Sequence, residues 1–177
     1  MIRNRLTTTN NSSFKLAWQL YNDSFPIDER RQLYLQKLLM DNKDYNFDIV
    51  TDNGAFVGFI LWWQFNKLRY IEHFAVDTKY RGKGYGKNII TQFISESTDD
   101  LILEVEIPNT EINNKRIAFY KQLGFKLNKY YYQQLPMQKN GSSIQLLLMT
   151  YPNYLSELKL SFFKQSFRAI CYDPYFL

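Results

Sequence analysis

Three of the seven glycines in this 177-residue chain fall within five positions, at Gly82, Gly84 and Gly86. Glycine inside a regular element costs stability, so such a cluster indicates backbone that a larger side chain would obstruct. The cluster follows an apolar, strand-like segment that ends at Val76 and precedes a segment with helical spacing. A strand, a glycine-rich turn and a helix start together present free backbone N–H groups to an anion. The pattern therefore predicts a phosphate-binding loop.

The spacing of these glycines excludes two common phosphate loops. A dinucleotide fingerprint needs G-x-G-x-x-G, whereas this chain has G-x-G-x-G. A P-loop needs four residues between its glycines and Ser or Thr after the lysine; here three residues lie between Gly82 and Gly86, and Asn88 follows Lys87. The pattern that fits is R-x-x-G-x-G over residues 81–86. A tight turn that merely precedes a helix is the alternative interpretation of the glycines alone.

Two motifs together give the chain its resemblance to a known family. The loop at 81–86 (RGKGYG) resembles the acyl-CoA pyrophosphate loop of the GCN5-related N-acetyltransferase (GNAT) family. Residues 113–125 (NNKRIAFYKQLGF) resemble the later helix of the family, which carries a tyrosine followed by L-G-F. The motifs stand in the order and at the distance that the family shows. The resemblance spans roughly residues 2–152. Within the family, the chain is similar to a bacterial subgroup.

The resemblance implies acetyl-CoA as the cofactor. Backbone N–H groups of the loop would hold its diphosphate, and a backbone N–H near Val76, where the family separates its fourth and fifth strands, would polarise the thioester carbonyl. The implied cofactor-binding residues are Phe74, Ala75, Val76, Arg81, Gly82, Lys83, Gly84, Tyr85, Gly86, Lys87 and Asn113.

Attack on a thioester requires an unprotonated amine, and an amine of pKa about 10.4 is protonated at neutral pH. Strict alternation along the fourth strand puts Glu72 on the face of Val76, and the resemblance implies that a glutamate at this position reaches the amine. Glu72 is therefore the candidate base. The alternatives are a water chain as the base and an ordinary solvated role for Glu72. His73 would point the other way, as a core histidine. Glu104 and Glu106 are second choices, either as the base or as an acidic lip that attracts a cationic amine substrate.

Tyr120 is the candidate acid, because by resemblance it gives its phenolic proton to the departing thiolate. The alternative is a helix aromatic that packs on the sheet. Asn113 matches the cofactor-contacting asparagine of the family, although Asn114 offers a second alignment and Arg116 stands where many members have alanine.

The predicted elements follow the order β-α-α-β-β-β-α-β-α-β-β-α, which indicates one mixed α/β domain in which the fourth and fifth strands are parallel neighbours. The resemblance implies the GNAT fold, a mixed central sheet of six to seven strands flanked by helices, over residues 1–152. Residues 153–177 would form a C-terminal helical extension packed on the same domain, with a dimer contact as the alternative. Strands are expected at 3–9, 47–51, 55–65, 69–76, 101–107, 125–134 and 144–151, and helices from residue 14, around 35–39, and at 86–96, 114–123 and 154–168.

Composition narrows the possible partners. The net charge is +5, but the basic side chains cluster at the glycine loop, which suits a small polyanion better than a nucleic acid. One cysteine, Cys171, and one histidine exclude an internal disulfide and make a zinc site unexpected. No apolar run approaches the ~18 residues of a membrane span, and the first residues show no secretory signal. We therefore expect a cytoplasmic monomer or homodimer without a metal.

These observations predict an acetyl-CoA-dependent N-acetyltransferase. It would move an acetyl group to a primary amine, on a small molecule or a peptide, by direct attack through a tetrahedral intermediate. The alternative is a non-catalytic module of the same fold that only binds CoA.

Overall fold

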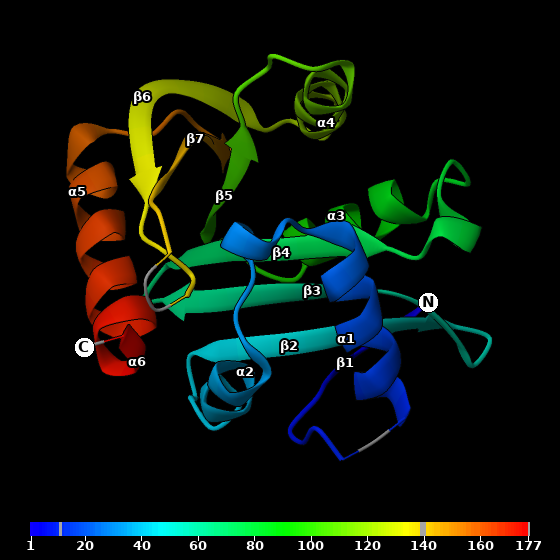
Figure 1. Cartoon of the computed structure of the whole chain (residues 1–177). Helices are drawn as coiled ribbons and strands as arrows, with labels where there is room; N and C mark the ends of the chain where they lie inside the picture. The colour runs from blue at the N-terminus through cyan, green and yellow to red at the C-terminus, as the bar shows by residue number, and fades with distance from the viewer. Residues whose placement is uncertain (11, 139–140, 177) are drawn as a thin grey trace.

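A seven-stranded mixed sheet forms the centre of the molecule in the computed structural model, which describes residues 1–10, 12–138 and 141–176 (Figure 1). The element order agrees with the prediction, although the first strand ends at Arg5 rather than Thr9. The strands are β1 (Ile2–Arg5), β2 (Tyr45–Asp52), β3 (Ala55–Phe65), β4 (Leu68–Val76), β5 (Asp100–Glu106), β6 (Lys126–Gln134) and β7 (Ile144–Tyr151). The helices are α1 (Ser12–Ser24), α2 (Leu33–Leu39), α3 (Tyr85–Ser95), α4 (Glu111–Gln122), α5 (Glu157–Ser166) and α6 (Asp173–Phe176); the short helical turns are η1 (Ile27–Glu29), η2 (Thr78–Tyr80) and η3 (Phe167–Tyr172).

The strands lie in the order β1-β2-β3-β4-β5-β7-β6, and β4 and β5 form a parallel pair, as predicted. Their pairing joins Leu68–Ile71 to residues 100–103 and goes no further. Beyond that point β4 stays with β3 as far as Val76, whereas β5 stays with β7 as far as Glu106. The two strands therefore separate, and in Figure 1 β5 turns away from β4.

Each face of the sheet carries its own apolar core. We call the side covered by α1, α2 and α5 the α1 face, and the side covered by α3 and α4 the α3 face. The α1 face is rich in aromatic side chains, among them Phe47, Phe59 and Trp63, all of them buried. The α3 face packs Ile90 and Phe93 of α3 against the aliphatic side chains of β5. This two-sided burial explains why the central strands read as nearly continuous apolar runs.

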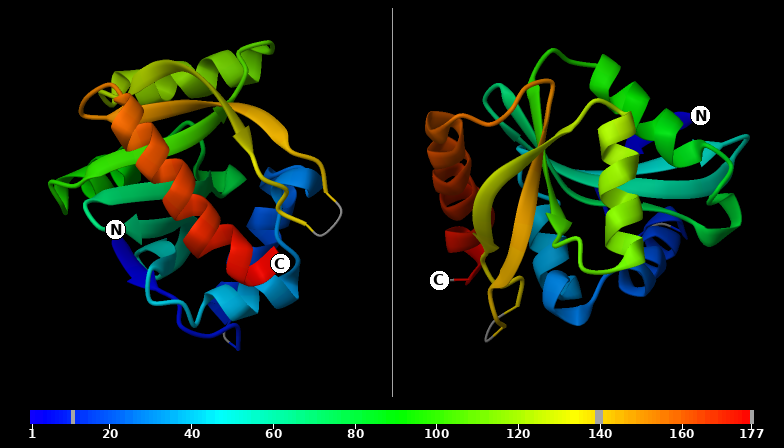
Figure 2. Two further views of the ribbon diagram at one scale, coloured as in Figure 1. Left: turned by 90° about the vertical axis from the view of Figure 1, so that its left-hand side faces the viewer. Right: turned by 90° about the horizontal axis from the view of Figure 1, so that it is seen from above.

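The C-terminal segment packs into the core of the α1 face. Phe163 of α5 and Phe167 of η3 are buried and contact Tyr70 of β4 through their rings. Figure 2 shows α5 and the turns that follow it running beside β6 and β7. We therefore propose that residues 153–177 extend the 1–152 domain rather than form a separate unit.

None of the helices in the described ranges combines the length and the apolar character that crossing a bilayer requires. Across the same ranges, no group of three or more His, Cys, Asp or Glu side chains is placed to hold a metal ion.

Candidate active site

The separation of β4 and β5 opens a cavity of about 560 Å³ in the middle of the sheet. Its walls come from both strands, from the end of α1 and from α4, and they include Phe74, Ala75 and Val76. One edge of β4 stays hydrogen-bonded to β3. Only the other edge of β4, which faces β5, therefore borders the cavity. The cavity therefore connects the α1 face with the α3 face through the sheet.

The backbone of Val76 points into this gap. The side chain of Arg81 donates from Nε to the carbonyl oxygen of Val76 at 2.8 Å, while the next N–H, that of Asp77, bonds to Val57 of β3. In a strand, the N–H and C=O of one residue project to the same side. The Val76 N–H is thus directed away from β3 and into the gap between β4 and β5. A thioester carbonyl placed in this gap could accept a hydrogen bond from it.

The glycine loop lines a second cleft of about 380 Å³ at the start of α3. Gly82 and Gly84 have φ values of 72° and 84°, a conformation that L side chains rarely adopt, and no atom lies within 4 Å of a Cβ placed at either position. Gly84 is also the N-cap of α3 and provides no side-chain cap, so the first N–H groups of the helix face the cleft unpaired by a side chain. Backbone of this kind can bind an anion.

The residues predicted to bind the cofactor divide into two groups. Those that line the cleft are Phe74, Val76, Arg81, Gly82, Gly84, Gly86 and Lys87, and Ala75 lines the neighbouring cavity. Three others lie outside both linings in the described structure. Lys83 Nζ lies 6.0 Å from the ring centre of Tyr80, and the Tyr85 hydroxyl donates to Asp52. Asn113 donates from Nδ2 to the carbonyl oxygen of Ile107 at 3.0 Å, so it holds the loop before α4.

The structure corrects the alternation on which the expected position of Glu72 rested. Adjacent residues of β3 pair with Ile71 and with His73, so Glu72 is the extra residue of a β-bulge. The bulge turns both Glu72 and His73 toward the α1 face, whereas Val76 packs on the α3 face. Glu72 therefore does not share the face of Val76, and His73 does not point away from Glu72. The His73 ring packs edge-on against Phe25, with Nε2 2.9 Å from the carbonyl oxygen of Glu29.

Glu72 is held in a buried ion pair. Both of its carboxylate oxygens accept from the guanidinium of Arg31, and Oε1 also accepts from the indole of Trp63 at 3.2 Å. Burial alone would raise the pKa of Glu72, but the Arg31 charge and the hydrogen bonds outweigh it and lower the pKa to about 2. A carboxylate of that pKa is a weak proton acceptor, which weighs against Glu72 as the base.

Glu104 has the opposite environment. Oε2 accepts from the hydroxyl of Tyr70 at 2.7 Å and from the amide of Gln134, and no positive charge is paired with it in the described structure. Burial is the dominant effect and, with a smaller contribution from the Glu72 charge, raises the pKa of Glu104 to about 8, although the hydrogen bonds from Tyr70 and Gln134 oppose it. A carboxyl that titrates this close to neutral pH is well matched to proton transfer.

Tyr120 lies across the gap from Glu104. It belongs to the core of the α3 face and lines the cavity from α4, whereas Glu104 and its partner Tyr70 belong to the α1 face. Burial raises the pKa of Tyr120 to about 12, so its hydroxyl keeps its proton at neutral pH. A potential base and a potential acid thus face one cavity from opposite sides of the sheet. Glu106, in contrast, is paired with Arg116.

Sequence analysis missed three residues of this site: Arg31, Tyr70 and Gln134. Arg31 lies in a connection without periodicity, and Gln134 reaches Glu104 from a strand that does not adjoin β5. Gln134 could have been noticed in the sequence, because it follows the aromatic residues of β6 and glutamine is seldom buried. Glu104 Oε1 and Gln134 Oε1 have no hydrogen-bond partner within the described ranges, so the wall of the cavity keeps two oxygens available.

Comparison with known proteins agrees with this geometry. The sequence pattern of the acetyltransferase (GNAT) family matches residues 12–125, well over half of the chain. The chain belongs to the GNAT family. It is accordingly an acyltransferase with the GNAT fold, and acetyl transfer is its general activity. No curated protein matches the sequence.

Solved structures of the family share the architecture. A protein from Bacteroides thetaiotaomicron assigned to the GNAT acetyltransferases is 29% identical over 97% of this chain and 98% of its own, with a TM-score of 0.90. The ribosomal-protein-S18-alanine N-acetyltransferase of Escherichia coli is 20% identical over 88% of this chain and 95% of its own, at a TM-score of 0.58. An aminoglycoside 6'-N-acetyltransferase bound to coenzyme A is 17% identical over 85% of this chain and 96% of its own, with a TM-score of 0.57. The latter two establish the fold alone.

The Arg31–Glu72 pair makes a prediction about stability. Replacing Glu72 with Gln strands the Arg31 charge in the core, and we expect a loss of about 3–5 kcal/mol in the free energy of unfolding, measured by urea denaturation at pH 7. Since the folded pKa of Glu72 is below its ordinary 4.5, the wild-type contribution is present above about pH 4.5 and is lost as the pH falls toward 2. The loss of stability in the variant should therefore become smaller in acid.

The exposed Lys115–Glu111 pair is the matched control, because Lys115→Met should cost under about 1 kcal/mol. Equal stability of Glu72→Gln and wild type would contradict the structural role.

Proposed function

We propose that this protein transfers the acetyl group of acetyl-CoA to a primary amine, which enters the cavity from the α1 face. One observation carries the proposal: a single gap between β4 and β5 joins the glycine-loop cleft to the Glu104 carboxyl. The cofactor would lie along the α3 face, with its diphosphate on the loop and its thioester at Val76. The amine and the thioester would then meet inside the sheet, away from bulk water.

The loop would bind the diphosphate mainly through main-chain groups. Gly84 begins α3 without a side-chain cap, so the N–H groups of Tyr85, Gly86 and Lys87 are directed to the phosphate oxygens. Arg81 uses Nε to hold the Val76 carbonyl, which leaves it a positioning role as well as a charge. Lys87 lines the cleft and supplies a further positive charge.

Each chemical step has a residue in place. Glu104 takes a proton from the incoming ammonium, and the freed amine nitrogen attacks the carbonyl carbon of the thioester. The Val76 N–H donates to the oxygen that becomes negatively charged, a contribution of about 3 kcal/mol for a fixed donor. When the C–S bond breaks, Tyr120 donates its phenolic proton to the sulfur. The nitrogen of the intermediate still carries one proton more than the amide, and it gives this proton to the Tyr120 phenolate. The products are the amide and CoA thiol, Tyr120 is protonated again, and Glu104 releases its proton to solvent.

The overall proposal is tested in two measurements. Acetyl-CoA, but neither ATP nor NAD, should raise the melting temperature; a ligand at 100 times its Kd adds about 2.7 kcal/mol. Release of CoA thiol with a panel of primary amines should then exceed release without amine. Stabilisation without release by any amine would instead favour a non-catalytic CoA-binding module.

For the loop, Gly84→Val should weaken acetyl-CoA binding at least tenfold, about 1.4 kcal/mol, in isothermal titration calorimetry. The valine strains a backbone with φ of 84° and projects into the space that the phosphate needs. Gly54→Val is the matched control, since Gly54 has a φ of 79°, equally open surroundings and a place in the β2–β3 turn. It should lose comparable stability and keep its affinity. Unchanged affinity in a folded Gly84→Val protein would rule out the loop as the phosphate site.

For the base, Glu104→Gln should lower kcat/KM for acetyl transfer by about 10²–10⁴-fold. Wild-type kcat/KM should rise with pH and level off above about 8, because Glu104 must be ionised. The same substitution should stabilise the fold near neutral pH. The folded pKa of Glu104 lies above its ordinary 4.5, so the protein loses stability as the pH rises from 4.5 toward 8, and glutamine removes this loss. Glu106→Gln is the control and should stay active. If Glu72→Gln removed the activity and Glu104→Gln did not, Glu72 would be the base.

For the acid, Tyr120→Phe should lower kcat by roughly 10-fold to 100-fold while the KM for acetyl-CoA changes little. The loss is moderate because a thiol of pKa about 8.5 is a tolerable leaving group without assistance. Steady-state kinetics at pH 7 measures the split between kcat and KM. Tyr151→Phe, a second aromatic residue beside Phe125, is the control. Full activity of Tyr120→Phe would contradict the assignment.

A further inference from the structure

Two aromatic side chains of the C-terminal segment support the hydrogen-bond network of Glu104 from behind. Phe163 and Phe167, which we call the aromatic wedge, are 0% and 3% exposed. The ring of Tyr70 stands nearly perpendicular to both, with centroids 5.1 Å from Phe163 and 5.7 Å from Phe167. Phe163 also contacts the ring of Tyr132, at 5.6 Å.

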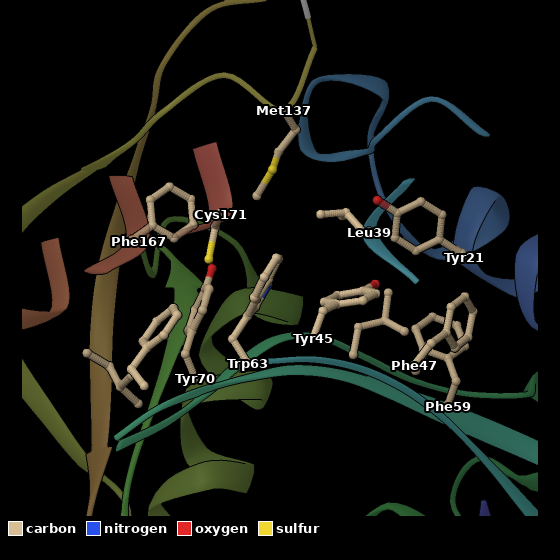
Figure 3. Packing of buried hydrophobic residues seen from close by; sticks show 14 of the residues in the cluster. Tyr21, Leu39, Tyr45, Phe47, Phe59, Trp63, Tyr70, Met137, Phe167 and Cys171 are labelled. Atoms are coloured by element: carbon tan, nitrogen blue, oxygen red, sulfur yellow. The ribbon is translucent and has the colours of Figure 1, made fainter. Parts of the chain in front are cut away.

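Tyr70 connects this wedge to the active site. It rises from β4 between Trp63 on one side and Phe167 on the other, with Cys171 near its tip (Figure 3). Its hydroxyl donates to Glu104 Oε2 at 2.7 Å. The two rings of the wedge, together with Phe65, thus pack around the ring that carries this hydroxyl. The wedge lies beyond residues 12–125, which match the family pattern.

We propose that the aromatic wedge is a positioning element of the acetyl transfer: it fixes the hydroxyl of Tyr70 against Glu104, packs on the ring of Tyr132, and excludes water from the rear of the carboxylate. This inference rests on the proposed role of Glu104 as the base. Phe163 and Phe167 act through Tyr70 and Tyr132, and neither touches the reacting atoms.

The groups around Glu104 explain why dryness at its rear matters. The titratable and charged side chains beside Glu104 are Tyr70, Tyr132 of β6, Cys171 of η3 and Glu72 with Arg31. Others share the walls of its cavity, namely His73 of β4, Glu106 of β5, Tyr120 and Arg116 of α4, and Glu29 of η1. Burial raises the pKa values of Tyr70, Tyr132 and Cys171, so these groups stay neutral. Glu72 is neutralised by Arg31. Loss of water therefore dominates the environment of Glu104. The wedge packs on the rings of Tyr70 and Tyr132, and we expect it to keep water from this side of the carboxyl.

The test follows the titration of Glu104 itself, without a substrate. The carboxyl carbon of Glu104 is observed by NMR in ¹³C-labelled protein and assigned by its disappearance in Glu104→Gln. In Phe163→Ala, water reaches the space beside Tyr70, and the pKa of Glu104 should fall by about one unit or more toward its ordinary value. Phe163→Leu, which keeps the site apolar, should restore most of the shift. If Phe163→Ala fails to fold, Phe167→Ala takes its place.

Phe47→Ala is the matched control. Phe47 is a buried phenylalanine of the same core, but it packs against Phe14 and Phe59. It should lower stability and leave the titration of Glu104 unchanged. An unshifted Glu104 in a folded wedge variant, or an equal shift in Phe47→Ala, would overturn the proposal.

A second readout separates this proposal from the role of Glu104. The pH profile of CoA release with n-propylamine should move to lower pH in Phe163→Ala by the same amount as the NMR titration. If the NMR titration shifts and the rate profile does not, the wedge positions Glu104 but Glu104 is not the base.

Discussion

The active-site cavity depends on the point where β4 and β5 stop pairing. A strand edge that leaves its partner exposes N–H and C=O groups, and an unsatisfied buried group of this kind costs about 1–3 kcal/mol. This chain satisfies part of that edge from within, because Arg81 donates to the Val76 carbonyl. We propose that the Val76 N–H binds the thioester carbonyl. The same divergence makes a passage between the two faces, so that groups on opposite sides of the sheet can act on one bond.

Glu72 and Glu104 show how environment separates two carboxyl groups of the same sheet. Both are buried, and burial favours the neutral form of each. Glu72 faces a guanidinium, which more than offsets the loss of water and keeps it ionised, whereas Glu104 accepts its hydrogen bonds from a hydroxyl and an amide. The first is therefore suited to holding the connection between α1 and α2 against the sheet, and the second to exchanging a proton. Pairs of carboxyls with opposite pKa shifts commonly indicate such a division of roles.

The C-terminal segment shows how a part of the chain beyond the family pattern can reach the chemistry. Its two phenylalanines pack against the rings of Tyr70 and Tyr132, and the Tyr70 hydroxyl donates to Glu104. A buried carboxyl whose pKa lies near neutral pH lowers the stability of the fold when it ionises. The packing of the surrounding core has to offset this loss.

The sequence by itself determined the family, the order of the elements, the parallel β4–β5 pair and the glycine loop, because these depend on local patterns: apolar periodicity, glycines at fixed offsets and a tyrosine followed by L-G-F. Tertiary structure decided which of the two strand carboxyls, Glu72 or Glu104, has the raised pKa. A single bulge at Glu72 reversed the expected alternation, and strand order brought Gln134 of β6 to Glu104 across β7. Neither follows from spacing, since the pKa of a buried group depends on its neighbours in space, and those come from segments far apart in the chain.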